Sequence, residues 1–269
     1  MNIEDDILLS MINAAIAAGR AIEDVKKSSS YAIHSKSDNS PVTDADYASQ
    51  HTIVDMISHL PIPMISEEEE SMPYETRKKW KEVFIIDPLD GTGEFINGTD
   101  EYGVNIALCR DGIPVTGVIY LPSQRELYYG SENITARKAV IEDSVISFSS
   151  IEDIESCILP LKQVEKRGYI CLASKSRRSE ETIAYYESLK KEKADLTILP
   201  VGSCVKYCHI ASGEADEYTR FGSVKEWDTA AGDALLRSMD MPLVDIHKGK
   251  PLLYNKEILN SSDFTVKRK

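Results

Sequence analysis

The chain has 269 residues, which is enough for one large domain or two packed lobes. Hydrophobic residues make up 42% and charged residues 28%, as in ordinary globular proteins, and no apolar stretch is long enough to span a bilayer. The net charge of −13 disfavours binding to nucleic acids or to an anionic membrane. The acidic N-terminus lacks the basic start of a signal peptide, so we expect a cytoplasmic protein, with peripheral association with the inner membrane left open.

The first half of the chain predicts helices followed by a mostly antiparallel sheet. Apolar residues at helical spacing indicate a helix over residues 3–25, and Thr43 is suited to cap a second helix that runs to residue 60. Short runs of apolar residues bounded by turn signals then predict strands, the last three of which form a meander because their turns are tight. These strands are expected at 63–66, 82–88, 102–109, 114–122 and 125–130.

After about residue 147 strands and helices alternate, which is typical of an α/β arrangement. Strands are expected at 169–174, 196–200 and 215–219, and helices at 179–192, 204–212 and 227–239. We therefore predict an N-terminal α+β lobe, residues 1–146, that holds most of the site. A C-terminal α/β lobe, residues 147–269, would complete it.

The segment IIDPLDGTGEF, residues 85–95, sets two carboxylates around a proline at the end of an apolar strand. Pro88 is expected to end the strand in a turn, so that Asp87 and Asp90 point at one spot. Gly91 and Thr92 follow at a predicted helix start, where backbone N–H groups favour anions. Hard oxygen ligands beside a phosphate site are what Mg²⁺ prefers.

Three further acidic residues have ordinary interpretations when each is considered alone. Asp228 lies at the front of a predicted helix and is suited to an N-cap. Glu67 begins a run of four glutamates, which is typical of a solvated face. Asp46 lies three residues after Thr43 and could complete a capping box.

Together these segments resemble the inositol monophosphatase superfamily of magnesium-dependent, lithium-sensitive phosphatases. The similarity is greatest to the 3′(2′),5′-bisphosphate nucleotidases of the bacterial CysQ type. The segments DNSPVTDAD (38–46), ISEEE (65–69), DPLDGTGEFI (87–96) and WDTAAG (227–232) occur in the order of that family, and VNIAL, GSCVKYC and RFG add to the match. The resemblance implies a layered α-β-α-β-α sandwich.

The resemblance also assigns roles to individual residues. Two or three Mg²⁺ ions would be held by Glu67, Asp87, Asp90, Asp228 and the Leu89 carbonyl. Thr92 and Glu67 would orient the nucleophilic water, and Asp46 would be a proton acceptor or a partner of a third metal ion. Gly91 and Thr92 would hold the scissile phosphate. Further substrate contacts are expected from Ser174, Lys175, Ser203, Lys206 and Arg220, with Glu67, Leu89, Asp90 and Asp228 also next to the substrate.

The implied reaction is removal of the 3′-phosphate from adenosine 3′,5′-bisphosphate, a recycling step in sulfur metabolism. One departure keeps an inositol or sugar-phosphate monoesterase open: the family pattern reads DGTKEF, and this chain has Gly93 in place of the lysine. A non-catalytic regulatory binding protein is disfavoured, because all five acidic positions are present. The sequence predicts a small-molecule substrate and leaves the choice between monomer and dimer open.

Overall fold

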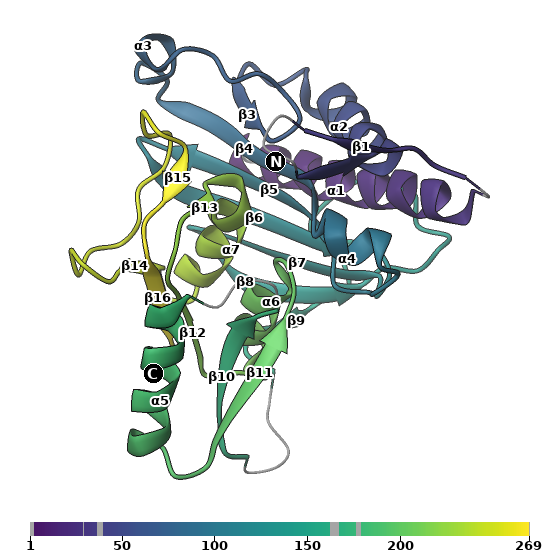
Figure 1. Cartoon of the computed structure of the whole chain (residues 1–269). Coiled ribbons are helices and arrows are strands. Elements are labelled where there is room, and N and C mark those ends of the chain that lie inside the picture. The colour runs from purple at the N-terminus through teal and green to yellow at the C-terminus, as the bar shows by residue number, and fades with distance from the viewer. Residues whose placement is uncertain (1–2, 29, 37–39, 162–166, 176–178, 269) are drawn as a thin grey trace.

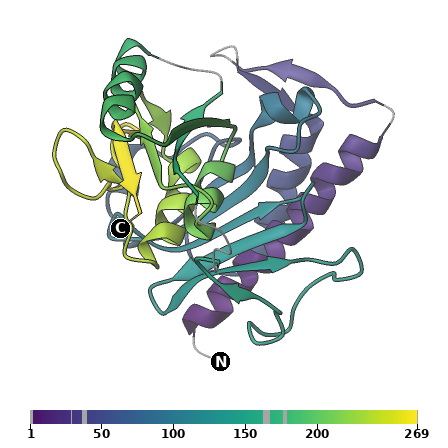
Figure 2. The same cartoon turned by 90° about the horizontal axis from the view of Figure 1, so that it is seen from below.

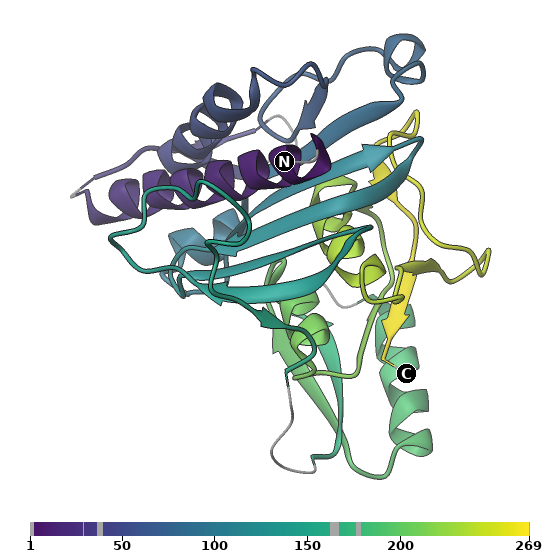
Figure 3. The same cartoon turned by 180° about the vertical axis from the view of Figure 1, so that it is seen from behind.

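The computed structural model describes residues 3–28, 30–36, 40–161, 167–175 and 179–268 (Figure 1), in which helices and sheets alternate in five layers. Helices α1 (Ile3–Lys27) and α2 (Asp44–Ile57) cover one face of a seven-stranded sheet, and α6 (Val205–Ser212) and α7 (Trp227–Arg237) pack on its other face (Figure 3). A five-stranded sheet follows, with α5 (Glu180–Glu192) on its far side, so α1 and α5 lie on opposite sides of the molecule (Figure 2). This is the predicted layered sandwich.

The seven-stranded sheet is a meander in which only the first pair of strands is parallel. Its strands in spatial order are β3 (Met64–Ser66), β4 (Glu82–Asp90), β5 (Gly103–Arg110), β6 (Ile113–Leu121), β7 (Glu126–Ser131), β8 (Ile134–Val140) and β9 (Cys157–Ile158). The predicted strands and the antiparallel meander are confirmed. Strand β8 was not predicted, because its only buried side chains are two alanines among polar and charged residues, so its hydrophobic signal is weak.

The second sheet has the order β11-β10-β12-β16-β14, with β10 parallel to both of its neighbours. Its strands are β10 (Tyr169–Ser174), β11 (Leu196–Val201), β12 (Glu217–Arg220), β14 (Val244–Asp245) and β16 (Phe264–Lys267). The remaining elements are short: β1 (Ile33–Ser35), β2 (Pro41–Thr43), α3 (Tyr74–Arg77), α4 (Thr92–Ile96), β13 (Val224–Lys225) and β15 (Asn260–Ser261). Of the described helices, none is both long enough and apolar enough to cross a membrane.

Helix α7 joins the two halves because it packs closely on β6. A Cβ atom at Gly117 of β6 would lie 2.4 Å from the carbonyl oxygen of Ala231 in α7, so the helix backbone lies almost directly on the strand. A hydrophobic core extends from Ile119 on β6 through Leu235 on α7 to Leu172 on β10. The lobe boundary after residue 146 stays a prediction, and β9 beyond it pairs with β8 of the first sheet.

The expected turn at Pro88 was wrong, because β4 continues through the proline to Asp90. Asp87 pairs with Asn105, and Asp90 pairs with Gly103. Between these two pairs, β4 has two residues where β5 has one. This extra residue is a β-bulge, a position in a strand that tolerates proline. Residues three apart in a regular strand point to opposite faces, and the bulge returns Asp90 to the face of Asp87.

Candidate active site

A cavity of about 680 Å³ lies where the two halves of the chain meet. The bulged end of β4, the first turn of α4, the ends of β10 and β12 and the start of α7 all border it. Except for Asp46, each predicted site residue lines it: Glu67, Asp87, Leu89, Asp90, Gly91, Thr92, Ser174, Lys175, Ser203, Lys206, Arg220 and Asp228. Residues separated by up to 161 positions therefore share one space.

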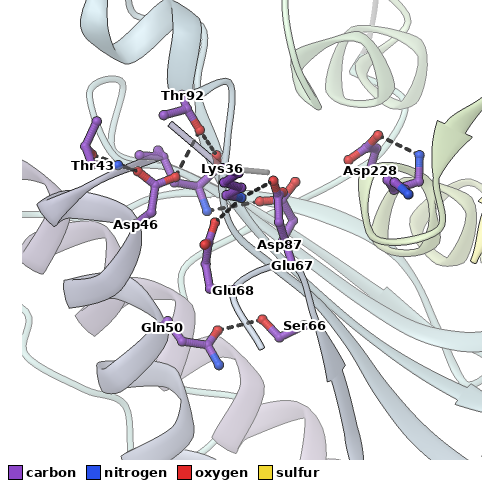
Figure 4. A network of polar contacts seen from close by, with 12 residues as sticks. Lys36, Thr43, Asp46, Gln50, Ser66, Glu67, Glu68, Asp87, Thr92 and Asp228 are labelled. Carbon is purple, nitrogen blue, oxygen red and sulfur yellow. Dashed lines mark hydrogen bonds and ion pairs between the residues drawn. The ribbon is translucent and has the colours of Figure 1, made fainter. Parts of the chain in front are cut away.

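Three carboxylates converge on the floor of this cavity. Glu67 follows β3, Asp87 lies on β4, and Asp228 lies in the first turn of α7, on the opposite side (Figure 4). Ligand oxygens of these three residues all lie within 4.8 Å of one another. Each comes from a different segment, so the cluster exists only when α7 is docked against the sheet.

Burial and mutual repulsion favour protonation of these acids. Burial raises the pKa of Asp87 well above its ordinary value, and the charges of Glu67, Asp90 and Asp228 raise it further. For the same reasons the pKa of Asp228 rises to about 8, although the Lys225 N–H donates to its carboxylate at 3.0 Å. A cation between these oxygens would remove the repulsion and favour the ionised forms.

Asp90 is held at both its main chain and its side chain. The Ser203 hydroxyl donates to the Asp90 carbonyl at 2.9 Å, and the Asn105 amide donates to its carboxylate at 3.3 Å. Burial raises the pKa of Asp90, while the charge of Lys206 lowers it. Lys206 itself is buried, and its ammonium donates to the carbonyls of Val201 and Ser203. This geometry gives Lys206 an electrostatic influence on Asp90, and its contact with substrate stays a prediction.

Thr92 and Asp46 form a hydrogen-bonded pair at the edge of the cavity. The Thr92 hydroxyl donates to Asp46 Oδ1 at 2.9 Å and lies 3.2 Å from the Leu89 carbonyl. The other carboxylate oxygen, Oδ2, accepts from the Thr43 N–H and hydroxyl, both at 2.7 Å, which confirms the capping box (Figure 4). Burial raises the pKa of Asp46, against these hydrogen bonds, which lower it. Asp46 therefore both caps α2 and contacts Thr92.

Lys36 is a neighbour of the cluster that sequence reasoning missed. Its ammonium lies 2.6 Å from Glu67 Oε1 and 2.7 Å from Glu68 Oε1 (Figure 4). Burial lowers the pKa of Lys36, but the charges of Glu67 and Glu68 outweigh this and raise it above its ordinary value. The sequence shows Lys36 just before the DNSPVTDAD segment, but no local pattern linked this lysine to residues 67 and 68.

The second half contributes two charged groups to the cavity wall. Arg220, at the end of β12, donates from Nη1 to the Ser174 hydroxyl at 2.6 Å. Lys175 follows β10 and forms a 2.6 Å ion pair with Glu101, another residue that sequence reasoning missed. The sequence ASKSRR, residues 173–178, was also a candidate for anion binding, but its last three residues lie outside the described part of the chain. So do Asp38 and Asn39 of the segment DNSPVTDAD.

Comparison with known proteins adds an independent observation. The model of the inositol monophosphatase family matches residues 4–268. The chain belongs to this family. Among family members, the 3′(2′),5′-bisphosphate nucleotidase CysQ of Shigella flexneri is 37% identical over 82% of each chain, and that of Haemophilus influenzae is 30% identical over 99% of this chain and 94% of its own.

Solved structures of the family agree with the fold. The crystal structure of CysQ from Bacteroides thetaiotaomicron is 37% identical, covers 98% of each chain and has a TM-score of 0.87. An inositol monophosphatase from Thermotoga maritima, 20% identical, has a TM-score of 0.73 over 97% of this chain and 92% of its own, and shows the shared fold.

The family is generally magnesium-dependent, and the residues present in this member fit that ion. The donor set consists of carboxylate oxygens, the ligands that Mg²⁺ prefers, and neither sulfur nor imidazole is among them. Three carboxylates within 4.8 Å of one another repel strongly when they are ionised, unless they share a cation. Asp90 and the Leu89 carbonyl line the same cavity, so a second ion has candidate ligands.

Proposed function

We propose that this chain is a Mg²⁺-dependent 3′(2′),5′-bisphosphate nucleotidase that hydrolyses the 3′-phosphate of adenosine 3′,5′-bisphosphate to AMP and phosphate. The observation that carries the proposal is the convergence of Glu67, Asp87 and Asp228 beside the Thr92–Asp46 pair, on the floor of one cavity. The relatives named as bisphosphate nucleotidases support the choice of substrate.

The cofactor supplies positive charge where the phosphoryl oxygens become more negative in the transition state. In this proposal Glu67, Asp87, Asp90, Asp228 and the Leu89 carbonyl hold two or three Mg²⁺ ions. The number of ions is part of the proposal, because a single group of three carboxylates is close enough to share one ion among the described residues.

Thr92 and Asp46 position the attacking water and receive its proton. Because the Thr92 hydroxyl donates its hydrogen to Asp46, its lone pairs are left to accept a hydrogen bond from water. Glu67 is the second group that orients this water. As the water oxygen bonds to phosphorus, the bond to the ribose 3′-oxygen breaks, and that oxygen takes up a proton from a solvent water molecule. A proton from the water passes through Thr92 to Asp46.

The scissile phosphate lies against the turn at Gly91 and Thr92 in this proposal. Gly91 has a φ of 97°, and a Cβ there would come within 2.8 Å of the Glu101 carbonyl oxygen, so glycine allows this turn. Ser174, Lys175 and Arg220 line the same cavity from the second half of the chain, where they are available to the rest of the nucleotide. Ser203, which also lines it, lies beside Gly91.

An inositol or sugar-phosphate monoesterase is the second candidate, favoured by Gly93. A Cβ at Gly93 would meet no atom within 4 Å, so the position leaves open space beside the cavity, without the lysine of the CysQ pattern. Phosphate release from adenosine 3′,5′-bisphosphate and from inositol 1-phosphate, each with and without MgCl₂, separates the two. We expect Mg²⁺-dependent release with a higher kcat/KM for the nucleotide. Turnover of the inositol ester alone would reject the nucleotidase.

A cytoplasmic location stays a prediction beside this function, and the choice between monomer and dimer stays open. The small-molecule substrate requires neither a nucleic acid nor a membrane surface.

A further inference from the structure

Glu101 joins three segments around the cavity without lining it. It lies between α4 and β5 in the first half of the chain. Its Oε2 atom accepts from the Lys175 ammonium at 2.6 Å and from the Gly202 N–H at 2.7 Å, and both of those residues belong to the second half. Lys175 and Gly202 line the cavity, whereas Glu101 is absent from the described residues of its wall.

The approach of Gly202 to Glu101 is too close for a side chain. A Cβ at Gly202 would lie 2.8 Å from Glu101 Oε2 and 2.8 Å from Glu94 Oε1. The turn continues into Ser203, which has a φ of 51° and donates to the Asp90 carbonyl at 2.9 Å. Glu101 thus contacts the turn at Gly202 and Ser203, and this turn also holds the main chain of Asp90, a predicted metal ligand.

Lys175 is suited to bind an anion in a way that Lys206 is not. The Lys206 ammonium is buried and donates to two backbone carbonyls, whereas the Lys175 side chain is 39% exposed and its described partner is Glu101, itself 25% exposed. An ammonium has three donors, and the bond to Glu101 uses one. The others remain available to oxygens in the cavity.

An ion pair this exposed adds little to the stability of the fold. Its larger effect is on the position of the Lys175 ammonium. A lysine without a partner samples many rotamers, whereas the Glu101 carboxylate restricts the ammonium to one region before substrate binds.

We propose that Glu101 is a positioning residue that holds Lys175 at the mouth of the cavity, where Lys175 binds the phosphate of the substrate that is not cleaved. This inference rests on the proposed nucleotidase function. Glu101 would therefore determine the preference for a bisphosphate over a nucleotide that lacks the second phosphate.

Isosteric substitutions test the pair. Glu101→Gln keeps an oxygen for the Gly202 N–H and removes the charge opposite Lys175, while Lys175→Met removes the ammonium and keeps most of the side-chain volume. The surface pair of Glu187 and Lys190 on α5, 2.7 Å apart, offers the matched control Glu187→Gln. Rates are measured in MgCl₂ with adenosine 3′,5′-bisphosphate and with adenosine 3′-monophosphate.

Each single variant is expected to raise KM for the bisphosphate about tenfold, because one charge-assisted contact with the substrate is lost. The value of kcat should change little. KM for the monophosphate stays at the wild-type value, and the double variant is no worse than Lys175→Met alone, because both changes remove one contact. Equal effects on both substrates, additive effects in the double variant, or a lower KM in Glu101→Gln would each overturn the proposal.

A binding measurement distinguishes failure of this inference from failure of the proposed nucleotidase function. If the wild-type protein releases no phosphate from the bisphosphate, the nucleotidase proposal fails. Calorimetric titration with AMP and with adenosine still tests the position of Lys175. AMP is expected to bind more tightly than adenosine, and Glu101→Gln to remove most of that difference. Wild-type protein that binds the two equally, or a variant that keeps the difference, contradicts the inference.

Discussion

At the scale of single residues, the side chain of Asp46 has two roles, one in capping a helix and one at the predicted site. One carboxylate oxygen accepts from Thr43 and caps α2, and the other accepts from Thr92 beside the cavity. The sequence predicted the capping box from the spacing of Thr43 and Asp46, and the resemblance suggested the catalytic role. Neither excludes the other, because each oxygen has its own partner.

The hydroxyl of Thr92 gives the sharpest residue-scale prediction. Thr92→Val removes the hydrogen bond to Asp46 and the acceptor for water, while the volume at the start of α4 stays nearly the same. We expect kcat to fall about 100-fold or more, as when a group that positions a proton transfer is lost. Initial rates at saturating bisphosphate nucleotide and MgCl₂ measure this.

Thr92→Ser is the matched variant for that experiment, because it keeps the hydroxyl and loses only a methyl group. It should retain kcat within about tenfold of the wild type, since the hydrogen bond to Asp46 can still form. A Val variant that turns over as fast as the Ser variant would remove Thr92 from the proposed mechanism.

At the scale of secondary-structure elements, the local patterns predicted most helices and strands but not the shape of the β4 end. Pro88 was expected to stop the strand, and the proline is instead accommodated in a bulge that lets pairing resume at Asp90. Such a bulge depends on the register of β5, which no local pattern reveals. The prediction that Asp87 and Asp90 line one site follows from this bulge rather than from a turn.

The docking of α7 on β6 offers a test at this scale. Gly117→Ala places a Cβ 2.4 Å from the Ala231 carbonyl oxygen and 2.8 Å from the Ala234 Cβ, so helix and strand must separate. We expect a loss of about 1–3 kcal/mol in the free energy of unfolding, typical of an overpacked contact. Because α7 carries Asp228, the Mg²⁺ concentration for half-maximal activity should also rise. Urea unfolding and a Mg²⁺ titration measure the two effects.

Gly93→Ala is the control for stability, since its Cβ would meet no atom within 4 Å and its position lies in α4. It should unfold at nearly the wild-type urea concentration. If Gly117→Ala also unfolds at the wild-type urea concentration, the close packing of α7 on β6 does not determine the position of Asp228.

For the whole molecule, the site is a product of tertiary packing. The five acidic positions could be named from sequence because each lies in a family motif. Their common position at one cavity depends on the docking of α7 and on the second sheet. Lys36 and Glu101 were missed for the same reason: their partners, Glu67 and Lys175, are distant in sequence, and a single lysine or glutamate has no local signal for such a contact.

This packing predicts that the metal-free protein becomes less stable as pH rises. The pKa of Asp228 is about 8 in the folded protein against an ordinary value of 3.8, and burial and its acidic neighbours raise the pKa of Asp87 as well. Between those two pH values the folded state binds more protons than the unfolded state, so the free energy of unfolding falls as pH increases. This stabilisation is complete below about pH 4 and is lost by about pH 8.

Melting temperatures measured in EDTA should therefore be several degrees lower at pH 8 than at pH 5.5, and MgCl₂ should reverse the trend. Mg²⁺ binds the ionised carboxylates of the folded state, so it stabilises most where those carboxylates are deprotonated. Asp228→Asn removes one titrating group and should flatten the pH dependence in EDTA and weaken the response to Mg²⁺. A wild-type protein in EDTA whose melting temperature is the same at both pH values would contradict a buried, repulsive carboxylate cluster at this site.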